Sequence, residues 1–251
     1  MRTRETSRTA DGILLPPPFR LITLREVGDA FAFATANAST EGAGTLVQVG
    51  RFDLAEFAVV LEPDDTLRTA RRTLYACMAA LADAIAVQAP PETAVTIVWP
   101  DALHVNAGLV GGGRLAWPED TGEDEIPEWI VFAAMIRLVS LADGEAGLFP
   151  LSATLEDEGF DGNAAERIVE TFARHLMSTL DAWQAEGFSA VTRSYLERLD
   201  RAAEKGLRRD IADNGDLTIR RMGQTEIERH SLLPALSTPS WRDPATGGPK
   251  L

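Results

Sequence analysis

The chain has 251 residues, which is enough for one large hydrophobic core and a small second unit. Its 45% hydrophobic and 25% charged residues are typical of a globular protein. The formal net charge of −14 opposes nucleic-acid binding, because phosphates need a basic surface. The single cysteine, Cys77, lies in an apolar context, so we expect a buried thiol and neither an internal disulfide nor a cysteine-rich metal cluster.

Neither the N-terminal residues nor the longest apolar run predicts a secretory signal or a membrane span. Residues 1–13 carry basic and hydroxyl side chains without an apolar stretch, so we expect a flexible tail rather than a secretory signal. The longest apolar run, 129–142, contains Arg137 and is too short to span a bilayer. We therefore expect a cytoplasmic protein without membrane contact.

The first half of the chain predicts alternating helices and strands. The expected elements are a polyproline stretch followed by an edge strand or an ordered arm at 14–24, a short helix at 25–39, strands at 42–50 and 55–63, and a long helix at 64–88. In the short helix, Val27, Phe31 and Ala34 share one face. Asp64 or Asp65 is placed to cap the long helix.

The second half predicts a hairpin, two helical regions and a small β unit. The expected elements are a strand at 94–100, a hairpin at 102–117, an acidic loop at 119–128, a buried strand at 129–142, a helix at 164–186, a further helix or irregular bridge at 190–206, and two strands at 207–222. Asn163 and Glu166 make a capping box for the 164–186 helix. Asn214-Gly215 is a two-residue hairpin signal between the last two strands.

These elements predict an α/β (α+β) fold, a mixed β-sheet with packed helices. Several strands are neighbours in sequence as hairpins, which disfavours a doubly wound parallel sheet. The expected organisation is a flexible tail at 1–13, a main domain at 14–188, a small C-terminal β domain at 189–237, and an extended Pro/Gly-rich tail at 238–251. Neither a G-x-G-x-x-G turn nor a G-x-x-x-x-G-K-[ST] loop is present, which disfavours those two kinds of nucleotide site.

The segment 95–119 carries the candidate ligand site. A β-branched run ends in Trp99-Pro100-Asp101, and the glycines Gly111, Gly112 and Gly113 follow. Two interpretations of the triplet stay open, a strand end with a capping Asp or the wall of a ligand pocket. The glycines indicate either a tight hairpin or close approach of the backbone to a ligand.

Three arginines and three histidines complete the candidates. Arg51 follows a glycine in a short loop and is the best candidate cation for a phosphate or carboxylate. Arg137 lies in a buried strand pattern, so we expect it to face a cavity or a paired acid. Arg114 is expected to be a solvated hairpin residue. The histidines, at 104, 175 and 230, have no metal-type spacing, and no metal site is predicted.

In this order of elements the chain resembles the biotin/lipoate A/B protein ligase family over about residues 20–200. The matching segments are VWPDAL (98–103), GLVGGGRL (108–115), VFAAMIR (131–137), LSATLEDEGFD (151–161) and the helix that ends before Gly187. The resemblance implies ATP and biotin or lipoate as substrates and a biotinyl or lipoyl carrier domain as partner. Family members join the acyl carboxylate to AMP and then transfer the acyl group to a carrier lysine.

The chain departs from the family pattern at its charged positions. Two family lysines fall at Val98 and Leu109, and the long glycine/arginine loop is reduced to Gly50 and Arg51. Loss of a cation that faces a developing anion costs about 3 kcal/mol of transition-state stabilisation. Two functions therefore remain open. One is acyl transfer to or from a carrier lysine with a remodelled site, and the other is non-catalytic binding of a biotin- or lipoyl-type group or its carrier domain.

Overall fold

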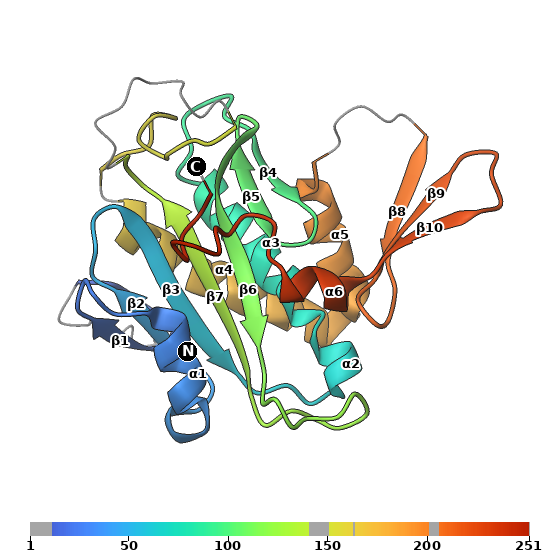
Figure 1. The fold of residues 1–251 in the computed structure, drawn as a ribbon, viewed down its shortest axis with the longest axis horizontal. Helices are drawn as coiled ribbons and strands as arrows, with labels where there is room; N and C mark the ends of the chain where they lie inside the picture. The colour runs from blue at the N-terminus through green and yellow to red at the C-terminus, as the bar shows by residue number, and fades with distance from the viewer. Residues whose placement is uncertain (1–11, 141–150, 163, 201–205, 251) are drawn as a thin grey trace, which may run out of the picture.

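The main body of the protein is a seven-stranded sheet in the order β1-β2-β3-β7-β6-β5-β4 (Figure 1). The computed structural model describes residues 12–140, 151–162, 164–200 and 206–250. The strands are β1 (Arg20–Leu24), β2 (Thr45–Val49), β3 (Leu54–Leu61), β4 (Val95–Val98), β5 (Ala102–Val105), β6 (Gly108–Ala116) and β7 (Ile130–Arg137). Only the pair of β1 and β2 is parallel among these neighbours, so the predicted mixed sheet is confirmed.

The two faces of the sheet are covered differently. Helices α3 (Thr73–Ala86), α4 (Ala164–Glu186) and α5 (Phe188–Arg198) pack on one face, which we call the α3 face. Helix α1 (Ala30–Glu41) packs on the other, which we call the α1 face. Side chains alternate between the faces along each strand. On β7, Phe132 joins the core of the α3 face, and its neighbour Ala133 joins that of the α1 face.

The central strands are apolar on both sides because both faces are covered. β3 and β7 pair along their whole length, from Leu54 opposite Arg137 to Leu61 opposite Ile130. On the α3 face, the ring of Phe172 from α4 lies 4.8 Å from Phe57 and 5.8 Å from Phe132, centroid to centroid. This aromatic cluster fixes α4 across the middle of the sheet.

Two of the predicted helices begin later than expected. Helix α1 starts at Ala30 because Asp29 caps it, accepting a hydrogen bond from the Ala32 N–H at 2.8 Å. Val27 lies before the cap and is 95% exposed, so its predicted place on the apolar face is wrong. The predicted 64–88 helix is broken into α2 (Leu67–Ala70) and α3, and Thr66 rather than an aspartate precedes α2.

The break lies at Arg71 and Arg72. Arg71 pairs with Glu123, and the guanidinium of Arg72 lies 4.2 Å from the ring centroid of Phe188. Beyond the break, α3 is buried around nearly its whole circumference, because the sheet lies on one side and α4 and α5 on the other. Cys77 is fully buried there, as predicted.

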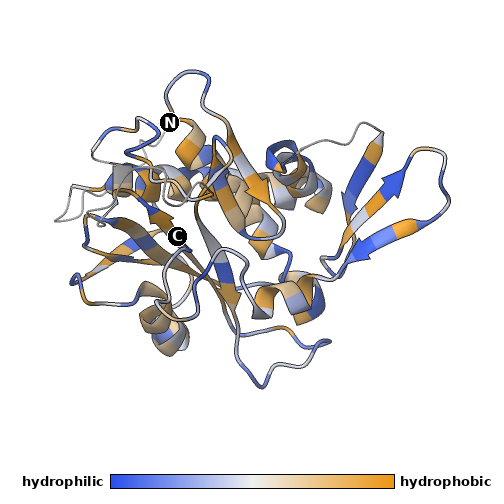
Figure 2. Ribbon diagram, turned by 45° about the horizontal axis from the view of Figure 1, so that its top comes forward, coloured by the Kyte–Doolittle hydropathy of each residue, from blue (hydrophilic) through white to orange (hydrophobic). Residues whose placement is uncertain are grey.

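The small C-terminal sheet has three antiparallel strands, β8 (Leu207–Ile211), β9 (Leu217–Arg221) and β10 (Ile227–His230). The third strand was not predicted. The turn around Asn214-Gly215 is longer than the predicted two-residue turn, and the Ala212 N–H donates to the Asp216 carbonyl at 2.9 Å. Hydrophilic residues dominate these strands, in contrast to the main sheet (Figure 2).

The helix at 164–186 has the predicted bounds, whereas its expected Asn163 cap lies outside the described residues. After the short α6 (Leu232–Ser237) the chain crosses the α1 face in front of β6 and β7 (Figure 1). The expectation of an extended tail over the surface at 238–251 is wrong, because Trp241 is only 1% exposed and residues 242–249 turn back on themselves. None of the helices in the described part of the chain is long and apolar enough to cross a membrane.

Candidate functional site

The α1 face beside helix α1 gathers most of the charged residues that the sheet buries. Glu56 of β3, Arg114 of β6 and Arg137 of β7 all project from this face, and Arg51 reaches it from the loop before β3. Residues 239–250, which we call the C-terminal segment, cover the part of the face over β6. Four of the eight predicted site residues lie on or beside this face: Arg51, Asp101, Gly112 and Arg137.

Gly112 brings the C-terminal segment close to the sheet. A Cβ atom on Gly112 would lie 2.4 Å from Cδ1 of Trp241 and 2.2 Å from the carbonyl oxygen of Asp101, so no larger residue fits. The indole Nε1–H of Trp241 donates to the carbonyl of Gly113 at 3.0 Å. The glycine run therefore does allow a close approach to the backbone, and the group that approaches is the protein's own tryptophan.

Asp101 is fully buried beside this contact. Its Oδ1 accepts a hydrogen bond from the Ser240 hydroxyl at 3.4 Å, while no hydrogen-bond partner of its Oδ2 is found in the described part of the chain. Burial raises the pKa of the Asp101 carboxyl to about 7. The Lys250 ammonium acts weakly in the opposite direction. Asp101 is therefore a buried carboxyl on this face whose pKa lies well above the ordinary value of an aspartate.

Arg137 binds the end of the C-terminal segment. Its Nη2 donates to the carbonyls of Pro249 and Lys250 at 2.7 and 3.0 Å, and its Nη1 donates to the Ser152 hydroxyl. Among the residues that the structure describes, carbonyl and hydroxyl oxygens bind this guanidinium, and neither a cavity nor a paired acid is found beside it. Burial lowers the pKa of Arg137.

Arg51 is neutralised by two carboxylates of its own neighbourhood. Its Nε and Nη2 donate to the two oxygens of Asp53 at 2.7 and 2.6 Å, and its Nη1 lies 3.4 Å from Glu56 Oε2. The hydrogen bonds from Arg51 lower the pKa of Asp53. Burial raises the pKa of Glu56, whose Oε1 accepts from the Ala30 N–H at the start of α1. Arg51 therefore ties the short loop to β3.

Arg114 is not the solvated residue that its hairpin position predicted. Its side chain is 13% exposed, and its guanidinium lies 3.7 Å from the ring centroid of Phe31 on α1. Its Nη2 is 3.8 Å from the carboxylate of Asp29. Burial lowers the pKa of Arg114 to about 10, and the charge of Arg242 in the C-terminal segment adds to this effect. Helix α1 thus covers the arginine that a bare hairpin would expose.

The other predicted site residues lie on the α3 face or within the strands. Trp99 donates through Nε1 to the hydroxyl of Tyr75 on α3 at 3.1 Å. The carbonyl of the buried Pro100 accepts from Tyr195 of α5 at 3.0 Å. A Cβ on Gly113 would meet Phe132 and Met78 in the core, whereas one on Gly111 would meet the backbone of Met135. Trp99, Pro100 and Gly113 therefore do not share a pocket with Arg137.

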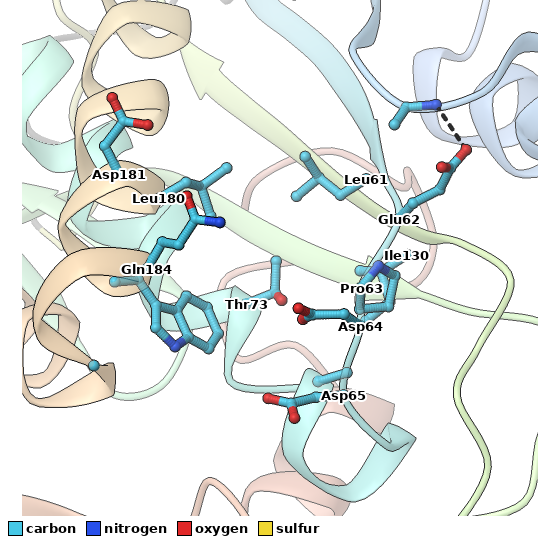
Figure 3. Close-up of a pocket in the computed structure, with 14 residues that line it drawn as sticks. Leu61, Glu62, Pro63, Asp64, Asp65, Thr73, Ile130, Leu180, Asp181 and Gln184 are labelled. Atoms are coloured by element: carbon cyan, nitrogen blue, oxygen red, sulfur yellow. Dashed lines mark hydrogen bonds between the residues drawn. The ribbon is translucent and has the colours of Figure 1, made fainter.

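A cavity of about 650 Å³ lies elsewhere, between the end of β3, α2, and the C-terminal half of α4 (Figure 3). In Figure 3, Asp64 and Asp65 approach it from the segment after β3, and Leu180 and Gln184 approach it from α4. None of the predicted site residues lines it. Its carboxylates repel phosphate and free carboxylate groups. In the described ranges, no group of three histidine, cysteine or acidic side chains is arranged to hold a metal ion.

The sequence over residues 15–197 matches the model of the biotin/lipoate A/B protein ligase family. The chain belongs to that family. The fold is similar to that of a biotin protein ligase-like protein of unknown function from Silicibacter sp. tm1040, with a TM-score of 0.74, 25% identity, and coverage of 89% of this chain and 99% of that one. A search among curated proteins finds no match.

Two biotin protein ligases share the fold at lower identity. The enzyme from Aquifex aeolicus has a TM-score of 0.61 at 14% identity over 85% of this chain and 99% of its own. The Leishmania major enzyme, solved with biotin, has a TM-score of 0.54 at 16% identity over 86% and 99%. These similarities establish the fold. At 14% and 16% identity they carry no statement about the activity of this chain.

Several residues of this site were missed or misjudged from the sequence. Ser240 and Trp241 belong to a Pro/Gly-rich stretch that carries no periodic signal, and only the isolated tryptophan in it hinted at burial. Glu56 sits in an apolar strand pattern, where a single acid is a signal for a buried partner. Val98 and Leu109, in contrast, are half-buried on strands of this same sheet, at the positions that the resemblance assigns to lysines.

Proposed function

We propose that the protein binds a biotin- or lipoyl-type acyl group in its neutral, amide-linked form on the α1 face, as presented by a lysine of a carrier domain, without activating the free acid. One observation carries this proposal. The guanidinium groups of Arg51 and Arg137 are already hydrogen-bonded by the protein's own carboxylates and carbonyls, and that of Arg114 lies over the Phe31 ring and 3.8 Å from the Asp29 carboxylate. A free carboxylate would have to break a hydrogen bond of Arg51 or Arg137, or displace Asp29 or Phe31 from Arg114, whereas an amide would not.

The strand residues of the α1 face also favour a neutral ligand. Val98 and Ala102 are opposite each other on β4 and β5, and Ala102 is opposite Gly112 on β6, so this row of the sheet carries small or apolar groups. An acyl chain gains about 0.8 kcal/mol per CH₂ group that it buries on such a surface. An adenylate would place its phosphate near the same row, where no lysine is available at Val98 or Leu109 to neutralise it.

Calorimetric titration at pH 7.5 tests the proposal. The ligands are biotinamide, lipoamide and a biotinylated carrier domain on one side, and free biotin, free lipoate and ATP on the other. We expect the amide forms to bind at least about tenfold more tightly than the free acids, a difference of about 1.4 kcal/mol. Stronger binding of the free acids, or binding that requires ATP, would reject the proposal.

A matched pair of substitutions locates the binding. Val98→Glu places a carboxylate in the apolar row of the α1 face and should abolish binding of the amides. Val87→Glu makes the same change at an exposed position after α3 and should leave binding unchanged. Equal losses in both variants would mean that the acyl group binds elsewhere.

Acyl transfer is a second candidate, and the buried carboxyl of Asp101 favours it. A pKa of about 7 suits a general base that works near neutral pH. In this reaction Asp101 takes a proton from the lysine ammonium. The amine nitrogen then forms a bond to the carbonyl carbon of an acyl thioester as its C–S bond breaks, and the leaving sulfur takes the second proton of that nitrogen and departs as a thiol. Transfer from an acyl thioester to Nα-acetyl-lysine, lost in Asp101→Asn, would support this function. No transfer above the uncatalysed rate would reject it.

A further inference from the structure

The C-terminal segment makes its polar contacts with the predicted ligand-binding residues. Ser240 donates to Asp101, Trp241 donates to the Gly113 carbonyl, and Arg137 donates to the last carbonyls of the segment. The indole ring itself lies on Gly112. The segment therefore uses the surface on which an acyl group would have to lie.

The segment also satisfies most of its own backbone groups. Arg242 and Pro249 form an antiparallel bridge, the Asp243 N–H donates to the Gly248 carbonyl at 2.9 Å, and the Lys250 N–H donates to the Trp241 carbonyl at 2.8 Å. The Arg242 side chain closes the turn with a 2.8 Å hydrogen bond to the Gly247 carbonyl. Because these bonds are internal, the turn can leave the sheet as a unit without breaking them.

The attachment of the segment depends on few apolar contacts. Between 241 and 250 only Trp241 and Pro249 are buried, and Pro244, Ala245 and Thr246 at the tip of the turn are exposed. One aromatic side chain thus supplies most of the apolar burial. A unit with few buried contacts opens at a lower free energy than the core of the same protein.

We propose that the C-terminal segment is a displaceable occupant of the α1-face site, and that Trp241 competes with the incoming acyl group for the surface of Gly112. The competition rests on the function proposed above, whereas the displaceability can be measured without any ligand. The apparent affinity of a ligand falls in proportion to the fraction of molecules in which the segment is open. The equilibrium between the bound and the displaced segment would therefore determine the apparent affinity of the site for its ligand.

The first experiment measures opening without a ligand. Hydrogen exchange by NMR on the full chain follows the Trp241 indole N–H and the Lys250 amide, with the amide of Val59 in the central strand β3 as internal reference. We expect the first two to exchange at least about a hundredfold faster than Val59, as local opening allows. Exchange at the rate of Val59 would overturn the proposal, because the segment would then leave only on global unfolding.

The second experiment measures competition. With 5-fluorotryptophan in all five tryptophans, the Trp241 signal is assigned from its absence in Trp241→Phe, and biotinamide and lipoamide are then added. We expect the bound state to shift the Trp241 signal to a solvent-exposed value. We also expect Trp241→Ala to bind the amides about tenfold or more tightly than the wild type. Trp117→Ala, the same deletion outside the site, is the control and should bind as the wild type does.

The two experiments separate the two proposals. Tight binding that leaves the Trp241 signal and the Trp241→Ala affinity unchanged overturns the competition, although the acyl-binding function survives. Fast exchange at Trp241 without binding of any amide to any variant supports a displaceable segment and rejects the acyl-binding function. If Trp241→Ala fails to fold, Trp241→Phe replaces it as the weakened anchor, and an affinity equal to that of the wild type would count against competition.

Discussion

The indole of Trp241 lies against Gly112 so closely that a single methyl group on the glycine would overlap it. Gly112→Ala places that methyl 2.4 Å from Trp241 Cδ1 and 2.2 Å from the Asp101 carbonyl. We expect the variant to lose about 1–3 kcal/mol of unfolding free energy, as overpacked sites do. Urea unfolding followed by circular dichroism measures the loss.

The control is Gly162→Ala, where no atom lies within 4 Å of the added carbon. Its stability should stay within about 0.5 kcal/mol of the wild type. Combining Gly112→Ala with Trp241→Ala should cost less than the sum of the two single changes, because removal of the indole relieves one of the two clashes. Strict additivity would show that the two side chains do not interact.

Asp101 should make the protein less stable as the pH rises. Burial raises its folded-state pKa to about 7, above the value of about 3.9 for an exposed aspartate in an unfolded chain. The folded state therefore holds the proton more tightly, and this stabilisation is full below about pH 4 and is lost as the pH rises through about 7.

The measurement compares wild type with Asp101→Asn by urea unfolding from pH 5 to pH 8. Within this window the wild type should lose stability relative to the variant with a slope of up to about 1.4 kcal/mol per pH unit. Groups that titrate in both proteins cancel in the difference. A difference that is constant with pH would mean that Asp101 stays ionised throughout.

Arg51 should matter for stability, because it compensates two buried acids. Arg51→Gln removes the one cation that pairs with Asp53 and Glu56 in the described part of the chain, which we expect to cost about 1–3 kcal/mol at pH 7. Arg20→Gln breaks a more exposed pair with Glu41 and should cost less than about 1 kcal/mol. Similar losses in both variants would contradict a structural role for the Arg51 cluster.

The pairing of Arg51 with Asp53 also determines how the unfolding free energy changes at acid pH. The pKa of Asp53 is lowered by Arg51, so its stabilisation is present above the unfolded pKa and is lost as the pH falls through the folded one. In Arg51→Gln the decrease in unfolding free energy at acid pH should be smaller. Acid titration of the two proteins, followed by circular dichroism from pH 6 downward, should therefore show a smaller change for the variant.

Adenylation of biotin or lipoate should be absent at ordinary enzymatic rates. The positions of the two family lysines are Val98 and Leu109, and the neighbouring arginines are engaged within the protein. Pyrophosphate release from ATP with biotin or lipoate, at micromolar protein, should remain far below the rates of about 1–10³ per second that are typical of enzymes. An active biotin protein ligase serves as the positive control. Turnover near one per second by this protein would contradict the expectation.

Local patterns predicted the regular elements of the fold well. The apolar spacing of Ile168, Phe172 and Leu176 predicted the α4 helix with its observed bounds, and the hairpin-rich order predicted a mixed sheet. The apolar spacing did not predict the break before α3, where Arg71 and Arg72 contact Glu123 and Phe188, which lie more than 50 residues away. Periodicity describes one element at a time and carries no information about such partners.

The candidate site shows the same limit. The sequence indicated that Gly112 admits a close neighbour and that Arg137 is buried, and both features are present. The neighbour itself, Trp241, lies in a stretch without periodicity, so its burial follows only from the folded arrangement. The family resemblance predicts that Trp99 and Arg137 share one site, but Trp99 lies directly after β4 and its indole donates to Tyr75 on the α3 face.

The long sequence separations of the Trp241 contacts bear on the order in which the protein folds. The hydrogen bonds of Ser240 to Asp101 and of Trp241 to Gly113 join residues 139 and 128 positions apart. Closing such long loops costs entropy before any contact repays it, so these bonds should form after the rate-limiting barrier. Weakening the Trp241 anchor should then accelerate unfolding and leave the refolding rate nearly unchanged. The C-terminal segment would thus govern how long the native state persists, while the sheet beneath it governs how fast that state is reached.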